Sequence, residues 1–302
     1  DETDAITLTD VDTNDGSITV DAGGLITATD VVASGGSGDS VTLSTTTGGA
    51  VATLVTGADA VSITANAGDI TIGSVTATAG TLGVTATAGS INDAADDNTA
   101  DFTAGGLITL TAQDEIGVLG SGSDLDLEFA AGSSVNVSTT GTGAIDLDGL
   151  GALTLSDVDT VNGAITASSA GALTVTDVAS GTNGNIVLST SSGDITGLAT
   201  VNAGSGNVTL NSAGAIVDDG SSGTVITGGV LTADAAGAIT IDSTVTSANI
   251  STSAAGAVDL DETDAITLTD VDTNDGSITV DAGGALTVTD VASGTNGNIV
   301  LS

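Results

Sequence analysis

The residues of this chain that could do chemistry are acidic, and one acidic segment has a spacing that suits a metal ion. Asp10, Asp12 and Asn14 stand at the first, third and fifth positions of a twelve-residue stretch that ends at Asp21. A calcium loop places oxygen ligands at these four positions, although its glycine comes one place earlier than Gly16 and its last ligand is usually Glu. The segment is typical of an Asp-rich turn, and a calcium site is the alternative.

The same segment occurs a second time near the end of the chain. Asp270, Asp272, Asn274 and Asp281 repeat the spacing, because residues 1–24 recur letter for letter as residues 261–284. An identical copy is not independent support for a calcium site, so both segments are expected to bind calcium or neither is.

Catalysis has little support in the composition. The chain contains no Lys, Arg, His, Cys or Tyr, so it lacks an obvious general base, an activated nucleophile and a cationic partner for an oxyanion. Paired carboxylates can hydrolyse glycosides, but that reaction needs one acid whose surroundings raise its pKa. We therefore predict that the protein is not an enzyme, that it has no catalytic residue, and that it takes no cofactor unless calcium binds.

Charge limits the partners of this chain. Thirty-nine acidic residues and no basic ones give a formal net charge of -39. No side chain can contact a phosphate with positive charge, which argues against nucleic acid and anionic membranes as partners and favours cations. The sequence also has no run of about 18 apolar residues, so we expect no direct membrane insertion. The absence of Cys is compatible with an extracellular protein.

Internal repeats predict how these residues are positioned. The pattern Ile/Leu-Thr-x-Thr/Ser-Asp-Val occurs as three pairs whose members are 20 residues apart, beginning at Ile6 and Ile26, Leu153 and Leu173, and Ile266 and Leu286. Self-similarity at a fixed period is the signature of a repeat architecture. One structural coil is therefore predicted to contain about 20 residues.

Each coil is predicted to consist of strand, turn, strand and turn. Residues 5–11 and 17–21 alternate apolar and polar residues as strands do, and the Asp, Asn and Gly residues of 12–16 and 22–24 favour turns. No window has a helical apolar stripe. The sequence predicts an all-β fold, a parallel β-helix or β-solenoid, as one continuous segment over residues 1–302. A loop is expected to leave it at residues 92–103.

Stacking of the coils follows from the period. Ile6 should lie beside Ile26, Leu153 beside Leu173 and Ile266 beside Leu286, with parallel strands about 4.8 Å apart. Aliphatic residues would fill the interior and Thr and Ser would form outward ladders. The Asp of each repeated pattern would also lie beside its equivalent, as in Asp10 and Asp30, Asp157 and Asp177, and Asp270 and Asp290.

The glycine-spaced strand units resemble a known family. Residues 88–91, 107–112 and 143–147 are similar to the haemagglutinin-type repeats of filamentous haemagglutinins and related giant bacterial surface adhesins. The resemblance implies a right-handed parallel β-helix in an extracellular or bacterial cell-surface protein. It also implies an adhesive or structural role.

These observations together favour a mechanical function. We expect the structural shaft of an extracellular repetitive adhesin or surface filament, with possible self-association along or beside the shaft and with a receptor that the sequence does not identify. The sequence begins and ends inside a repeat, which predicts an internal fragment of a much longer repeat protein. The alternative is a repeat module that binds cations, calcium above all, or ice through Thr-x-Thr strands.

Overall fold

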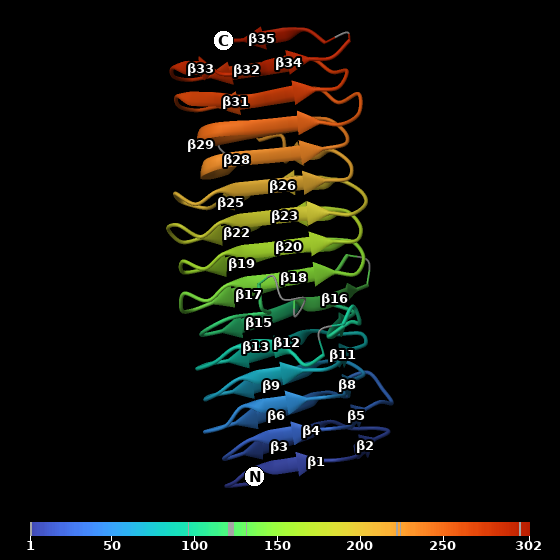
Figure 1. The fold of residues 1–302 in the computed structure, drawn as a ribbon. Coiled ribbons are helices and arrows are strands. Elements are labelled where there is room, and N and C mark those ends of the chain that lie inside the picture. The colour runs from blue at the N-terminus through green and yellow to red at the C-terminus, as the bar shows by residue number, and fades with distance from the viewer. Residues whose placement is uncertain are drawn as a thin grey trace. The chain divides into compact units, whose positions relative to one another are not determined.

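The fold is all-β in a computed structural model (Figure 1). The chain forms two compact units, residues 1–150 and 151–302. Strands and turns alternate throughout the part of the chain that the structure describes, where there is no helix and so none that could cross a membrane. The described residues are 2–95, 97–119, 124–130, 132–221, 223, 225–295 and 297–302.

The first unit is a β-solenoid in which most coils contribute three short strands. The first coil contains β1 (Ile6–Leu8), β2 (Val11–Thr13) and β3 (Ile18–Ala22). The strands of later coils are β4 (Ile26–Ala28), β5 (Val31–Ala33), β6 (Val41–Thr45), β7 (Ala50–Ala52), β8 (Val55–Gly57), β9 (Val61–Ala65), β10 (Ile70–Ile72), β11 (Val75–Ala77), β12 (Leu82–Ala86), β13 (Ile91–Asp93), β14 (Phe102–Ala104), β15 (Ile108–Ala112), β16 (Leu125–Phe129), β17 (Val135–Thr139) and β18 (Ile145–Gly149).

Equivalent strands of successive coils in this unit pair in parallel and form three faces. One face has the order β1-β4-β7-β10-β13. The second runs β2-β5-β8-β11-β14-β16, and the third runs β3-β6-β9-β12-β15-β17. Ile6 pairs with Ile26 as predicted.

The number of strands per coil differs from the sequence prediction. Residues 5–11 were expected to form one strand, but the chain bends between β1 and β2. Leu8 and Val11 face inward while Thr9 and Asp10, which separate them, are both exposed. Two consecutive outward residues break the two-residue alternation of a strand and make a corner. For the same reason Asp12 lies in β2 and not in the predicted turn.

The second unit repeats the architecture with some longer strands. Leu153 pairs with Leu173, and Ile266 pairs with Leu286, both as predicted. The strands are β19 (Leu153–Thr160), β20 (Ile165–Ser169), β21 (Leu173–Val175), β22 (Asp177–Ser180), β23 (Ile186–Thr190), β24 (Ile195–Leu198), β25 (Thr200–Asn202), β26 (Val208–Ser212), β27 (Ile216–Asp218), β28 (Ile226–Ala235), β29 (Ile239–Thr252), β30 (Val258–Glu262), β31 (Ile266–Thr273), β32 (Ile278–Ala282), β33 (Leu286–Val288), β34 (Val291–Ser293) and β35 (Ile299–Leu301).

Columns of small aliphatic side chains form the core of each unit. In the first unit Ile70 pairs with Ala50 on one side and Ile91 on the other, and all three are buried. In the second unit the buried Ile278 pairs with the buried Val258 on one side and with the exposed Ile299 of the last strand on the other. Full burial of one such side chain stabilises a fold by about 1.5–3 kcal/mol. Each coil that adds such a buried side chain therefore adds a similar stabilisation.

Hydroxyl groups close the turns from inside. A Thr at the last inward position of a strand donates a hydrogen bond to a glycine carbonyl three or four residues later, so a buried polar group is satisfied within its own turn. The bonds are Thr139 to Gly143 at 3.0 Å, Thr160 to Gly163 at 2.8 Å, Thr190 to Gly193 at 3.0 Å, Thr252 to Gly256 at 3.0 Å and Thr273 to Gly276 at 2.6 Å.

Two coils of the first unit are longer than the rest. Ile91 pairs with Ile116 and Ile116 with Ile145, which gives coils of 25 and 29 residues, against 20 between Ile6 and Ile26. The predicted loop at residues 92–103 lies in the first of them. The chain leaves β13 at Asp93 and returns in β14 at Phe102, whose side chain is fully buried. The extra residues therefore cross the outside of the solenoid and not its core.

We predict that Ile278→Ala lowers the free energy of unfolding of the second unit by roughly 2–5 kcal/mol, because truncation leaves a cavity in a stacked column. Thr279→Ala, at the neighbouring outward position of β32, is the matched control and should cost much less. Thermal melting followed by circular dichroism measures both variants. Equal losses for the two substitutions would contradict the inward assignment of Ile278.

Candidate functional site

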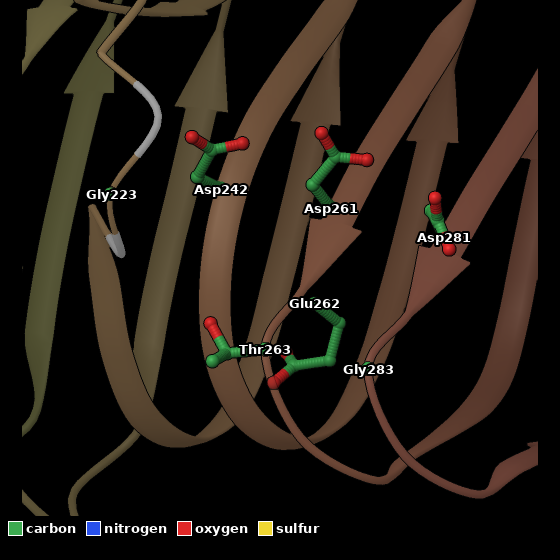
Figure 2. Close-up of a pocket in the computed structure, with 7 residues that line it drawn as sticks. All are labelled: Gly223, Asp242, Asp261, Glu262, Thr263, Asp281 and Gly283. Atoms are coloured by element: carbon green, nitrogen blue, oxygen red, sulfur yellow. The ribbon is translucent and has the colours of Figure 1, made fainter.

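An acidic hollow lies on the second unit (Figure 2). Its lining includes carboxylates from three neighbouring strands, together with small residues that leave them accessible. The lining residues are Gly223, Asp242, Asp261, Glu262, Thr263, Asp281 and Gly283.

An acid ladder runs along this hollow. Asp242 on β29 pairs with Asp261 on β30, and Asp261 pairs with Asp281 on β32. Figure 2 shows the three side chains on the same side of adjacent strands. Desolvation, followed by repulsion from other acids, raises the pKa values of Asp242 and Asp261 above the ordinary value. Such a row attracts cations, and its carboxylates are half-buried at Asp242 and exposed at Asp261 and Asp281.

Glu262, which is 3% exposed, lies beneath the ladder and has an environment of a different kind. Its Oε2 accepts hydrogen bonds from the Ser243 hydroxyl at 2.7 Å and the Val245 amide at 3.0 Å, and its Oε1 accepts one from the Asp264 amide at 3.1 Å. Three donors satisfy both oxygens of a buried carboxylate without any cationic side chain. Glu262 therefore ties two coils together.

The first predicted calcium segment is spread over two strands. Asp12 lies in β2 and Asp21 in β3, where Asp21 accepts a hydrogen bond from Ser44. Desolvation, then the neighbouring charges of Asp10 and Asp30, raises the pKa of Asp12. The predicted contact between Asp10 and Asp30 is confirmed, because the valines that follow them pair.

The second predicted segment is divided in the same way. Asp272 and Asn274 line a shallow hollow around the end of β31, whereas Asp281 lies in the acid ladder on β32. The pKa of Asp272 is raised by desolvation and then by Asp270 and Asp290, as expected for stacked acids. Calcium binding by these eight residues stays a prediction. The turn itself is closed by the Thr273 hydroxyl.

The sequence prediction missed a more compact group of acids in the first unit. Asp124, Asp126 and Asp148 can each offer a carboxylate oxygen, and these oxygens lie within 4.8 Å of one another. Of the acidic side chains that the structure describes, no other three or more are so close. The acid ladder had a readable signal, since its members are 19 and 20 residues apart. The compact group had none, because it lies where coil length is irregular.

Outward threonines do not form a regular array in the first unit. Of the predicted Thr-x-Thr segments at residues 7–9 and 27–29, Thr7 pairs with Thr27, but Thr27 pairs with Val51 on its other side. Thr109 and Thr111 on β15 have the same spacing. Their partners on one side are Gly83 and Thr85, and on the other they are Asn136 and Ser138. A flat ice-binding surface would need the same hydroxyl spacing on successive coils, so this face does not favour that alternative.

Comparisons with known proteins give no relative from which a role could be carried over. No family model matches the chain, and no curated protein or solved structure matches it.

We predict that Glu262→Ala destabilises the second unit, because it leaves the Ser243 hydroxyl and the Val245 amide buried without an acceptor. Each orphaned group costs about 1–3 kcal/mol. Glu2→Ala is a matched control, since Glu2 occupies the same place in the repeated sequence but is exposed. Thermal melting should show a large loss for the first variant and a small one for the second. A similar loss in both would contradict the role of burial.

Low pH should stabilise the folded state of this protein. Eight described aspartates have raised pKa values, including Asp159 at about 6, and only Asp219 has a lowered one. Desolvation is the first cause for Asp159, and repulsion by Asp157 is the second. A raised folded-state pKa contributes stability below the unfolded pKa of about 4 and loses it as pH rises through the folded value.

We therefore predict that the melting temperature falls as pH rises from about 4 to about 8 at constant ionic strength. Asp159→Asn should flatten the part of this fall below pH 6. Melting curves across a pH series measure both effects. A melting temperature that rises over this range would show that lowered pKa values dominate.

Proposed function

We propose that this chain is the structural shaft of an extracellular repetitive adhesin or surface filament and that it acts mechanically, without catalysis. The observation that carries the proposal is the in-register stacking of aliphatic columns through successive coils of each unit. Each coil depends on its neighbours for burial, as in other solenoids. Adding coils therefore lengthens the solenoid without changing its core, which suits a protein whose function is to span a distance.

The surface supports a role outside the cell. Acidic residues and hydroxyl groups dominate the outward positions, and the net charge of -39 keeps such a chain soluble at high concentration. The absence of Lys and Arg also removes every trypsin site. The resemblance of the strand units to haemagglutinin-type repeats points to the same location on or outside a bacterial cell.

Partners of the shaft follow from its chemistry. Cations are the expected small partners of so acidic a surface, and lateral contacts between shafts would need them to screen repulsion. A cation-binding module is the second candidate function, and the compact carboxylate group at Asp126 favours it. The ice-binding alternative has the weaker support, because the Thr ladder is interrupted at Gly83 and Asn136.

Force spectroscopy on the full chain tests the mechanical proposal. We expect resistance followed by stepwise opening, in which a coil of about 20 residues releases roughly 70 Å of extended chain. Ile278→Ala should lower the force of the steps that open its part of the second unit, and Thr279→Ala should not. Extension without measurable resistance would contradict the proposed mechanical role.

The proposed location is tested separately with antibodies raised against the purified chain. They should label intact cells of the source organism or material released from them. Labelling that requires permeabilised cells would contradict the extracellular part of the proposal and leave the mechanical part standing.

A further inference from the structure

The two long coils of the first unit bury acids at positions that elsewhere face solvent. Asp126 is 1% exposed and lies between two inward leucines on β16, so it occupies an outward position of the strand. Asp146, at the equivalent kind of position on β18, is also buried. Gly117 lies beside Asp146 in the stack, because Ile116 pairs with Ile145, and a Cβ on this glycine would lie 2.4 Å from the Asp146 carbonyl oxygen. Both acids are therefore buried on the outward side of their strands.

Strand register brings further carboxylates to Asp126. Asp126 pairs directly with Asp148 on β18. On the other side, the Asp126 amide donates to Asp101 Oδ2 at 3.0 Å, and the Asp101 amide donates to the Asp126 carbonyl oxygen at 3.0 Å. Asp124, one residue before β16, completes the group of three whose ligand oxygens lie within 4.8 Å.

Asp126 differs from two other buried acids, Asp39 and Glu262, in how its oxygens are satisfied. Asp39 accepts amide hydrogen bonds on both oxygens, from Gly16 and Gly36 at 2.8 Å each. Glu262 also accepts on both. By contrast, Oδ1 of Asp126 is buried and has no hydrogen-bond partner among the described residues. A buried carboxylate oxygen without a donor is costly unless a cation or a proton compensates it.

The chain itself cannot provide the compensating charge, because it has no Lys, Arg or His. Burial, followed by repulsion from Asp124 and Asp148, raises the pKa of Asp126 to about 7. Burial is also the largest cause of the raised pKa of Asp101, which is about 8. Compensation for the buried Asp126 oxygen must therefore come from a bound proton or from a cation taken from solution.

We propose that Asp124, Asp126 and Asp148 bind one hard divalent cation, calcium, and that this ion fastens the long coils of the first unit. Two oxygens on opposite sides of a calcium ion lie up to about 5.2 Å apart, since each calcium–oxygen distance is 2.3–2.6 Å. The oxygens of the three carboxylates meet this limit. Carboxylate oxygens are the ligands that calcium prefers, and water can fill the remaining positions. The ligand set contains no sulfur or imidazole that would favour zinc.

This site is distinct from the Asp-rich turns and independent of the mechanical proposal. The turns are exposed repeat copies, whereas these ligands come from a part of the chain that is not repeated letter for letter. Failure of calcium to bind would leave the stacked core and the shaft proposal unaffected.

Calorimetric titration of the full chain with calcium chloride, at neutral pH and constant ionic strength, tests the site. We expect one saturable site above the diffuse binding of a polyanion, with a melting temperature that rises as the site fills. Asp124→Asn and Asp148→Asn should each weaken binding by about tenfold or more, because calcium affinity follows the charge of its ligands. Magnesium chloride in place of calcium chloride should bind more weakly.

Two rival-site variants decide where the ion binds. Asp270→Asn alters an Asp-rich turn and Asp261→Asn alters the acid ladder, and both should retain the saturable site. Loss of the site in either variant, or a response to calcium that never saturates in the unmodified chain, would overturn the proposal.

Asp126→Asn gives a readout that does not depend on binding. With calcium chelated, this variant should melt at a higher temperature than the unmodified chain, because it removes a buried charge that has no cation beside it. With calcium present, the order should reverse. A lower melting temperature in the presence of chelator would show that the Asp126 carboxylate is already satisfied, and it would overturn the proposal.

Discussion

Parallel, in-register stacking is the constraint on which the rest of this structure depends. Neighbouring strands lie about 4.8 Å apart, so each side chain lies beside the residue one coil away. An aliphatic column such as Ala50, Ile70 and Ile91 gains from this arrangement because each member buries the next. Two aspartates at the same spacing repel by about 0.9 kcal/mol in water and by more where solvent is excluded. Stacking thus stabilises the aliphatic interior and destabilises ladders of acidic side chains.

The acidic side chains of this chain differ in what offsets their mutual repulsion and their burial. Members of the ladder at Asp242, Asp261 and Asp281 stay partly or fully exposed, so water and salt screen them. Glu262 is buried, but two amides and a hydroxyl donate to its oxygens. Asp126 has neither exposure nor a full set of donors. The absence of every basic side chain makes these distinctions matter, because ion pairs are not available to any acid of the chain.

Much of the fold could be predicted from the period of the sequence. The 20-residue spacing placed Ile6 beside Ile26 and Leu153 beside Leu173, since a slip of one residue would turn the apolar set outward. The third strand of each coil was missed because Thr9 and Asp10 look like a continuation of β1. Their side chains are both exposed, and a bend of this kind is set by the closure of the coil and not by local propensity.

The site could be predicted less well, for a related reason. A regular period locates residues that stack at constant spacing, and the acid ladder at Asp242, Asp261 and Asp281 could have been found in this way. Asp101, Asp126 and Asp148 are brought together by coils of unequal length, so no fixed offset connects them in the sequence. Asp101 and Asp126 are buried, whereas Asp148 is half-buried. In this chain the acids buried at outward strand positions, Asp126 and Asp146, lie where the coil length departs from the regular period, so the regularity that predicts the fold does not predict them.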